Sequence, residues 1–259
     1  MKKILFLSFY FKPDLSAGSF RNTPLANELS KIGLKKNIEI DVYTTLPNRY
    51  NEFNIKASET ERNDNLNIYR IKIPKHRNNM FDQIISFSYY YYKVSKLVKN
   101  KPYDLVYASS GRLFTAFLGY KLSKKIKCNL FLDIRDIFTD TLQHVLRSKI
   151  IKVPVMYFLN YIEKITFENA KHINLNSLGF KEYFKKYKKP NFSYYPNGID
   201  ENFLSNKKEN FIKKNNNKKR IIYAGNIGFG QGLDKIVPYD EKKLKKNYEF
   251  IIIGDGGAK

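Results

Sequence analysis

The sequence is poor in the features that mark an exported or membrane-spanning protein. It has one cysteine, Cys128, in 259 residues, which excludes an internal disulfide and fits a reducing compartment. No run of about 18 apolar residues occurs, so a membrane-spanning helix is not expected. The apolar start at 1–11 leads directly into Lys-Pro-Asp without a small-residue cleavage site, so we interpret it as a buried strand. These absences predict a cytoplasmic protein.

Acidic residues are also scarce, since 24 Asp and Glu stand against 47 Lys and Arg and give a net charge of +23. Such a charge attracts anions, which include nucleic acid, acidic lipid headgroups and phosphorylated small molecules. Lys and Asn are both abundant, and a coding bias toward them is an alternative source of the charge. No nucleic-acid-binding motif is present and the aromatic residues lie in apolar runs, so we expect no nucleic-acid partner.

Short apolar runs alternate with longer segments of helical period. Strands are expected at 4–9, 38–44, 68–73, 105–108, 130–133, 172–176 and 192–195, and helices at about 19–32, 81–99, 112–126, 150–170 and 177–187. Alternation of this kind predicts a parallel sheet covered by helices, and uninterrupted apolar strands fit burial on both faces.

A polar, basic segment at 206–219 interrupts this pattern and is interpreted as a linker. One further strand–helix–strand unit follows it. The predicted organisation is a complete Rossmann-like domain over 1–205, the linker, and the start of a second Rossmann-like domain over 220–259, because about forty residues are too few for a whole one.

The segment FYFKPDLSAGSFR (9–21) joins the first strand to the first helix. Gly18 and Ser19 stand where that helix should begin, and Arg21 follows within its first turn. Backbone N–H groups and the helix dipole favour an anion there. The alternative is an ordinary loop whose serine caps the helix. The pattern lacks the G-x-G-x-x-G spacing of a dinucleotide site.

The segment FLDIRDIFTD (131–140) ends a buried strand in a cluster of Asp133, Arg135, Asp136 and Asp140. Ligands of open α/β sheets bind at the carboxyl ends of strands, where a carboxylate can orient or deprotonate a hydroxyl. The alternative is a local salt bridge with helix capping. A metal site is weakly supported because no histidine accompanies the acids.

Two glycine-containing turns complete the motifs. In YYPNGID (194–200), Pro-Asn-Gly indicates a turn. In YAGNIGFGQGLDKI (223–236), four glycines lie between a strand and a helix, so the backbone can wrap a phosphate. The absence of a Gly-Lys-Ser/Thr ending disfavours an NTPase.

These motifs, in this order, resemble the retaining glycosyltransferases of the family-4 type, and within them the fucosaminyltransferase-like group of O-antigen and capsule synthesis. The stretches that carry the resemblance, which covers essentially the whole chain, are FYFKPDLSAGSFR, DLVYASSGRLFTAFLGYKLS, LDIRDIFTD, YYPNGID, IIYAGNIGFGQGLD and FIIIGDG. The resemblance implies a GT-B fold of two facing Rossmann-like domains, an acceptor in the first, a nucleotide-sugar donor in the second, and no metal or other cofactor.

The resemblance also assigns residues. It places Asp136, with Arg135 beside it, at the acceptor hydroxyl. It places the donor and its phosphates at Gly18, Ser19, Arg21, Gly225, Asn226, Gly228, Gln231, Gly232, Gly254, Asp255 and Gly256. Pro196, Asn197, Gly198 and Asp200 would mark the passage between domains.

Three departures from the family pattern stand out. Arg135 occupies a position where many relatives have histidine, and Asn226 and Gln231 replace an arginine and a lysine that clamp the diphosphate. The family's pair of glutamates, seven residues apart, lies beyond the Gly-Asp-Gly of 254–256, where this sequence ends. We therefore expect a truncated donor domain and little or no turnover by this chain alone.

The partners implied by the resemblance are a nucleotide-sugar, with UDP as the expected nucleotide, and a lipid-linked saccharide at the inner face of the cytoplasmic membrane. Two segments, 80–101 and 148–167, combine apolar residues with lysines and suit an anionic membrane surface. The alternative is that both are core helices whose lysines reach solvent. A non-catalytic remnant and a nucleotide-sugar epimerase of the same fold remain alternatives to the transferase.

Overall fold

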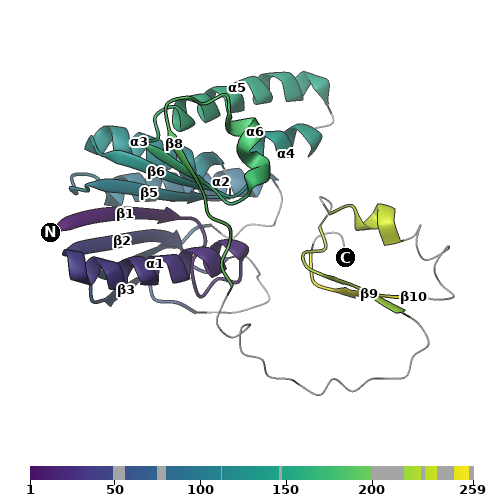
Figure 1. The fold of residues 1–259 in the computed structure, drawn as a ribbon, viewed down its shortest axis with the longest axis horizontal. Coiled ribbons are helices and arrows are strands. Elements are labelled where there is room, and N and C mark those ends of the chain that lie inside the picture. Colours follow the sequence, from purple (N-terminus) through teal and green to yellow (C-terminus); the bar gives the residue numbers. More distant parts are fainter. Residues whose placement is uncertain are drawn as a thin grey trace, which may run out of the picture. The chain divides into compact units, whose positions relative to one another are not determined.

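The computed structural model describes residues 1–48, 56–74, 80–111, 113–145, 148–199, 219–228, 231–237 and 248–256. The chain divides into two compact units, Met1–Gly198 and Ile199–Lys259 (Figure 1). The predicted linker at 206–219 lies, apart from Lys219, outside the described residues.

The first unit is built on an eight-stranded sheet of order β3-β4-β2-β1-β5-β6-β7-β8. Every neighbouring pair is parallel except β3 and β4, which are antiparallel. The strands are β1 Lys2–Ser8, β2 Ile38–Thr45, β3 Thr60–Asn63, β4 Leu66–Ile71, β5 Leu105–Ser110, β6 Asn129–Ile134, β7 His172–Leu175 and β8 Asn191–Tyr194. All seven strands predicted for this unit are present, and the expected parallel sheet is confirmed.

Helices cover both faces of the sheet (Figure 1). They are α1 Ala17–Lys36, α2 Met80–Leu97, α3 Leu113–Ile126, α4 Phe138–Val145, α5 Lys149–Phe167, the 3₁₀ turn η1 Leu178–Phe180 and α6 Lys181–Phe184. Side chains of β1 alternate between two cores, because Leu5 and Leu7 pack with α2, α3 and α5, whereas Phe6 packs with α1. Among the described helices, none is long and apolar enough to cross a bilayer.

Three local features differ from the sequence-based expectations. The edge strand β3 was not predicted, because its four residues are all exposed and show no apolar alternation. The helix α4 was also missed; it is only eight residues long and carries Asp140 in its first turn. The single helix expected at 177–187 is instead η1 followed by the one-turn α6, since the chain must reach Pro190 and enter β8.

The second unit contains a parallel pair of strands, β9 Lys219–Ala224 and β10 Tyr248–Ile253, with Lys219 opposite Tyr248. A helical turn covers 233–237 between them. The predicted strand–helix–strand order is therefore present in this unit.

Gly119 of α3 lies at a close approach of this helix to the sheet. A β-carbon built there would lie 2.9 Å from the Ala108 Cβ and 3.2 Å from the Leu130 Cδ1. We expect Gly119→Ala to lower the free energy of unfolding by about 1–3 kcal/mol, because the helix must move off the sheet. Urea denaturation measures this. Gly198→Ala is the control: nothing lies within 4 Å of its β-carbon, so a change below about 0.5 kcal/mol is expected. Equal stability of both variants would contradict the close packing of α3.

Candidate functional site

The strand order reverses between β1 and β5, which are neighbours in the sheet although their first paired residues, Ile4 and Leu105, lie far apart in the sequence. This reversal defines a switch point in the sheet.

 The loops that leave these two strands therefore diverge, and open α/β sheets bind ligands at this position, outside the carboxyl ends of the strands. The loop after β1 leads to Gly18 and Ser19, the loop after β5 contains Gly111, and the loop after β6 contains Arg135 and Asp136. The fold thus brings three separate loops to one edge.

The Arg135 side chain lies between the start of α1 and the end of β5. A β-carbon built on Gly18 would lie 3.2 Å from its Nη2 atom, and one built on Gly111 only 2.8 Å from it. Both glycines therefore leave room for the guanidinium. Its Nε is buried and has no hydrogen-bond partner among the described residues. Desolvation lowers the pKa of Arg135, and the nearby carboxylates of Asp133 and Asp136 oppose this effect.

The start of α1 adds a second electropositive group. Ser16 is the N-cap, and its Oγ accepts a hydrogen bond from the Ser19 N–H at 3.2 Å. For this loop, the alternative prediction was a serine that caps the helix, and Ser16 is that serine. Ser19 instead lies within the first turn and is fully buried. The positive end of the helix dipole lies at Gly18, beside Arg135.

Asp136 follows Arg135 and lines a small pocket together with Ser110, Phe138 and Glu163. The residue as a whole is exposed, but the surrounding protein partly desolvates its carboxyl group. This desolvation raises the pKa of Asp136, and the positive charge of Arg135 works in the opposite direction. A carboxyl group with a raised pKa is better suited to accept a proton.

Behind Asp136, the buried carboxylate of Glu163 holds α4 against α5. It accepts hydrogen bonds from the Thr139 hydroxyl at 2.5 Å and the Tyr183 hydroxyl at 2.6 Å, and also from the Tyr187 hydroxyl. Because Thr139 lies in the first turn of α4, these bonds fix the segment that carries Asp136.

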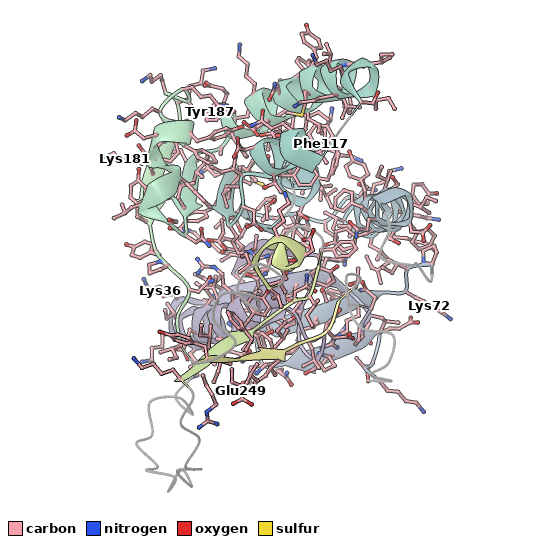
Figure 2. All side chains as sticks on the ribbon, turned by 90° about the vertical axis from the view of Figure 1, so that its right-hand side faces the viewer. Lys36, Lys72, Phe117, Lys181, Tyr187 and Glu249 are labelled. Atoms are coloured by element: carbon pink, nitrogen blue, oxygen red, sulfur yellow. The ribbon has the colours of Figure 1, made fainter. Side chains whose placement is uncertain are left out.

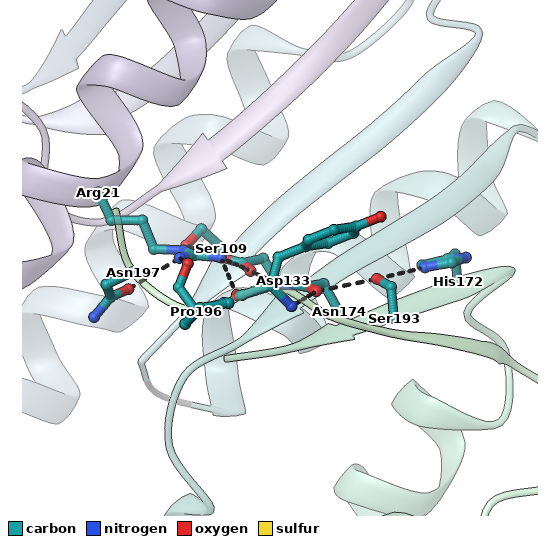
Figure 3. A network of polar contacts seen from close by, with 9 residues as sticks. Arg21, Ser109, Asp133, His172, Asn174, Ser193, Pro196 and Asn197 are labelled. Carbon is teal, nitrogen blue, oxygen red and sulfur yellow. Dashed lines mark hydrogen bonds and ion pairs between the residues drawn. The ribbon is translucent and has the colours of Figure 1, made fainter. Parts of the chain in front are cut away.

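A second buried carboxylate, Asp133, organises the same edge of the sheet (Figure 3). Its two oxygens accept hydrogen bonds from Nε and Nη2 of Arg21, both at 2.8 Å. Asp133 also accepts from Ser109 at the end of β5 and from Asn174 of β7. Arg21 in turn donates to the carbonyl of Pro196 and to the side-chain oxygen of Asn197, both at 2.9 Å.

In the second unit, the two predicted glycine-containing loops run side by side. The Gly225 N–H donates to the Ile253 carbonyl, and the Ile227 N–H donates to the Asp255 carbonyl. A β-carbon on Gly254 would lie 1.8 Å from the Gly225 carbonyl oxygen, so this backbone approach requires glycine.

The glycine-rich loop also has internal contacts. The Asn226 amide donates to the Gln231 side-chain oxygen at 3.3 Å. Gly228 lies against both side chains, and Gly232 has a positive φ of 63°. The structure therefore places 225–227 against 253–256, with Asn226, Gly228 and Gln231 beside one another in the glycine-rich loop.

The structure also shows where several other residues singled out from the sequence lie. Arg21 directs its guanidinium at Asp133 and at 195–197, and Gly198 ends the first unit. Asp140 is exposed and accepts a hydrogen bond from Gln143. Asp200 lies outside the described residues. Within the described part of the chain, no group of three or more His, Cys, Asp or Glu residues could hold a metal ion.

Sequence reasoning missed Gly111, Ser109 and Asn174 as members of the site. Gly111 stands in the segment ASSGRLF, directly after a predicted strand, and this position at a strand end was the available signal. Asn174 lies inside a strand, so its role depends on which strands are neighbours in the sheet.

No protein-family profile matches the sequence, and no curated protein matches it significantly. Among solved structures, sucrose-phosphate synthase from Thermosynechococcus elongatus superimposes with a TM-score of 0.60 at 11% identity, covering 98% of this chain and 71% of that one. A UDP-N-acetylglucosamine 2-epimerase superimposes with a TM-score of 0.51 at 14% identity, covering 96% of this chain and 62% of that one.

These likenesses confirm the predicted α/β fold of GT-B type. Identities this low establish a shared fold and leave substrate and chemistry open. The resemblance to family-4 transferases, and the roles that it assigns to individual residues, therefore stay predictions.

The Arg21–Asp133 ion pair yields a stability prediction, because only 11% of the Arg21 side chain and 1% of the Asp133 side chain are exposed. Arg21→Met leaves a buried carboxylate without its cation and should lower the free energy of unfolding by about 3 kcal/mol. Lys31→Met is the control, since its ion pair with Glu28 is exposed and should contribute less than about 0.5 kcal/mol. Urea denaturation of the two variants measures the difference, and similar losses would contradict the structural importance of the pair.

The raised pKa of Asp136 yields a pH-dependent prediction. The folded protein holds this proton more tightly than the unfolded chain does, so ionisation of Asp136 reduces stability as pH rises through its folded-state pKa. Asp136→Asn should therefore melt at a higher temperature than the parent at neutral pH. The gap should close below about pH 4, where the parent carboxyl is protonated in both states. Asp140→Asn controls for the loss of one negative charge. A gap independent of pH would refute this account.

Proposed function

We propose that this chain is part of a nucleotide-sugar-dependent glycosyltransferase that transfers a sugar, with retention of its anomeric configuration, to a lipid-linked saccharide. The observation that carries the proposal is the position of Arg135. Its guanidinium lies between the start of α1 and Gly111, at the switch point of the sheet, with the Asp136 carboxylate beside it.

The chemistry of glycosyl transfer requires a site for a departing diphosphate. Arg135 and the first turn of α1 supply positive charge at one place. Partial burial of the guanidinium strengthens its attraction for an anion, because less water competes. Arginine also presents a fork of N–H groups that matches phosphate oxygens.

The acceptor requires a group that orients its hydroxyl. The Asp136 carboxylate stands next to Arg135, and its raised pKa favours acceptance of a proton. Glu163 supports this arrangement by fixing the first turn of α4. Asp136 would thus hold the acceptor hydroxyl while Arg135 stabilises the leaving diphosphate.

In the second unit, the paired loops fit the donor. Backbone N–H groups between Gly225 and Gly232 would contact the diphosphate, with the neutral side chains of Asn226 and Gln231 in place of cations. The loop of Gly254, Asp255 and Gly256 would lie beside the nucleotide base, for which UDP is our proposal.

The finer parts of the proposal follow from the family resemblance alone. They are the lipid-linked acceptor, the synthesis of O-antigen or capsule, and a location at the inner face of the cytoplasmic membrane. No metal or other cofactor is part of the proposed reaction.

A second candidate function is epimerisation of a nucleotide-sugar. The structural likeness to UDP-N-acetylglucosamine 2-epimerase favours it, because that enzyme shares the fold. Epimerisation needs the nucleotide-sugar alone, whereas transfer needs an acceptor. Nuclear magnetic resonance of reaction mixtures with and without a lipid-linked saccharide separates the two, since only the transferase requires the acceptor and forms a new glycosidic bond.

Binding tests the proposed role of Arg135. Calorimetric titration of the full chain with UDP, UDP-sugars and pyrophosphate should show binding that weakens with added salt. Arg135→Met should reduce the affinity for these ligands on the order of ten-fold or more, because it removes a charge-assisted contact. Arg62→Met is the matched control, since Arg62 is an exposed arginine on β3. Unchanged affinity in Arg135→Met, with circular dichroism showing an intact fold, would count against the proposed site.

A further inference from the structure

A cavity of about 350 Å³ opens in the first unit at the amino ends of β1, β2 and β4. This volume lies within the range of small-molecule sites, roughly 300–1,000 Å³. Its polar lining residues are Lys3, Glu39, Asp41, Arg62, Asn67 and Lys101, and it is called the amino-edge pocket below.

The amino-edge pocket is separate from the candidate site around Arg135, which lies at the carboxyl ends of the strands. Because a strand rises about 3.3 Å per residue, Lys3 lies roughly 16 Å from Ser8 at the other end of β1. A ligand in the pocket would therefore be distinct from one held beside Arg135.

The strand register explains why the charged residues of the pocket lie together. Lys3 of β1 pairs with Glu39 of β2, Asp41 of β2 pairs with Asn67 of β4, and Asn67 also pairs with Arg62 of β3. Residues paired across neighbouring strands point to the same face of a sheet. The five side chains thus form one row across four strands.

This row interrupts an otherwise apolar face. The next residues on the same side of β1 and β2, Leu5 and Tyr43, are fully buried in the core. Yet Asp41 is only 5% exposed and Asn67 only 9%. Buried charged networks are often no better for stability than apolar residues of similar size, and departures from the local pattern are expected at functional sites. The row therefore calls for an explanation beyond folding.

Hydrogen bonds hold the acidic side of the pocket in place. The Asn67 amide donates to Glu39 Oε1 at 2.7 Å and to Asp41 Oδ1 at 2.8 Å. The Tyr103 hydroxyl donates to Asp41 Oδ2 at 2.6 Å, and Lys3 Nζ lies 2.6 Å from Glu39 Oε2. The Glu39 side chain remains 19% exposed, so it presents a fixed acceptor.

The cations supply the donors. Lys101 Nζ donates to the Tyr43 hydroxyl at 2.8 Å and lies 5.0 Å from the centre of the Tyr69 ring. An ammonium group carries three N–H donors and a guanidinium five. Lys101 and Lys3 therefore keep further N–H groups for a ligand, and Arg62 adds a planar fork of them.

Positive charge by itself does not distinguish the pocket. Figure 2 shows lysines such as Lys36, Lys72 and Lys181 projecting from several parts of the surface. The distinguishing feature of the amino-edge pocket is that cations and carboxylates line one cavity together, beside the rings of Tyr69 and Pro102.

This mixture selects the kind of ligand. Three cations and two carboxylates line the pocket, so a small anion would meet two carboxylates and a small cation would meet three positive groups. A hydroxyl group both donates and accepts a hydrogen bond. A neutral molecule with several hydroxyls can therefore use both kinds of side chain, and the C–H faces of a sugar ring suit the rings of Tyr69 and Pro102.

We propose that the amino-edge pocket binds a saccharide. Glu39 accepts hydrogen bonds from its hydroxyls, while Lys3, Arg62 and Lys101 donate to its oxygens. The buried Asp41 and Asn67 hold Glu39 in position. This inference goes beyond the proposed function and does not depend on it, since the site lies at the opposite edge of the sheet and takes a sugar without a nucleotide.

Saturation-transfer difference nuclear magnetic resonance on the full chain tests the proposal, with glucose, N-acetylglucosamine and rhamnose as probes. At least one sugar should receive saturation from the protein in the absence of nucleotide. Lys101→Met and Arg62→Met should each weaken its affinity on the order of ten-fold, because each removes a charge-assisted hydrogen bond. Both variants should keep the parent's affinity for UDP.

Lys2→Met is the matched control. Lys2 is an exposed neighbour of Lys3 on β1, and successive side chains of a strand point to opposite faces, so this variant should bind the sugar as the parent does. Circular dichroism confirms that each variant is folded.

Three results would overturn the proposal. The first is the absence of saturation transfer to all three sugars. The second is a sugar signal that Asp136→Asn abolishes but Lys101→Met and Arg62→Met leave unchanged, which would assign the sugar to the candidate site. The third is displacement of the sugar by millimolar inorganic phosphate, which would show that the pocket selects anions.

Discussion

The buried ion pair of Arg21 and Asp133 is the interaction on which the functional edge of the first unit depends. A carboxylate that is almost fully removed from water is stable only if its oxygens are paired and hydrogen-bonded. Asp133 satisfies this requirement with partners from α1, β5 and β7, and Arg21 extends the network to the chain after β8. Since each partner comes from a different element, the pair holds the carboxyl ends of the strands in one arrangement.

The candidate site is built on this framework by a combination of small and charged residues. Gly18 and Gly111 leave space that the Arg135 guanidinium occupies. A cation beside a helix N-terminus and a partly desolvated carboxylate is a suitable arrangement for reactions in which a phosphorylated group departs and a hydroxyl attacks. The same edge of the sheet therefore carries two kinds of charged residue. Arg21 and Asp133 are paired with each other, whereas Arg135 and Asp136 are the charged residues that we propose act on a ligand.

Helix α5 carries apolar side chains on two sides. The inner side stabilises the first unit and carries Glu163, which fixes the segment next to Asp136. The outer side has no partner within the first unit that matches its apolar character.

The sequence by itself determined the strand–helix alternation, the parallel sheet, and the grouping of candidate residues at strand ends, because periodicity and glycine placement are local properties of the chain. It did not reveal β3, whose exposed residues carry no periodic signal, or the short α4. Only the tertiary structure decided that Arg135 lies between Gly18 and Gly111, that Asp133 engages Arg21, and that apolar residues of α5 such as Ile150 and Tyr157 are exposed. Each of these depends on which strands and helices become neighbours, and contacts between residues a hundred positions apart are fixed by packing rather than by local sequence.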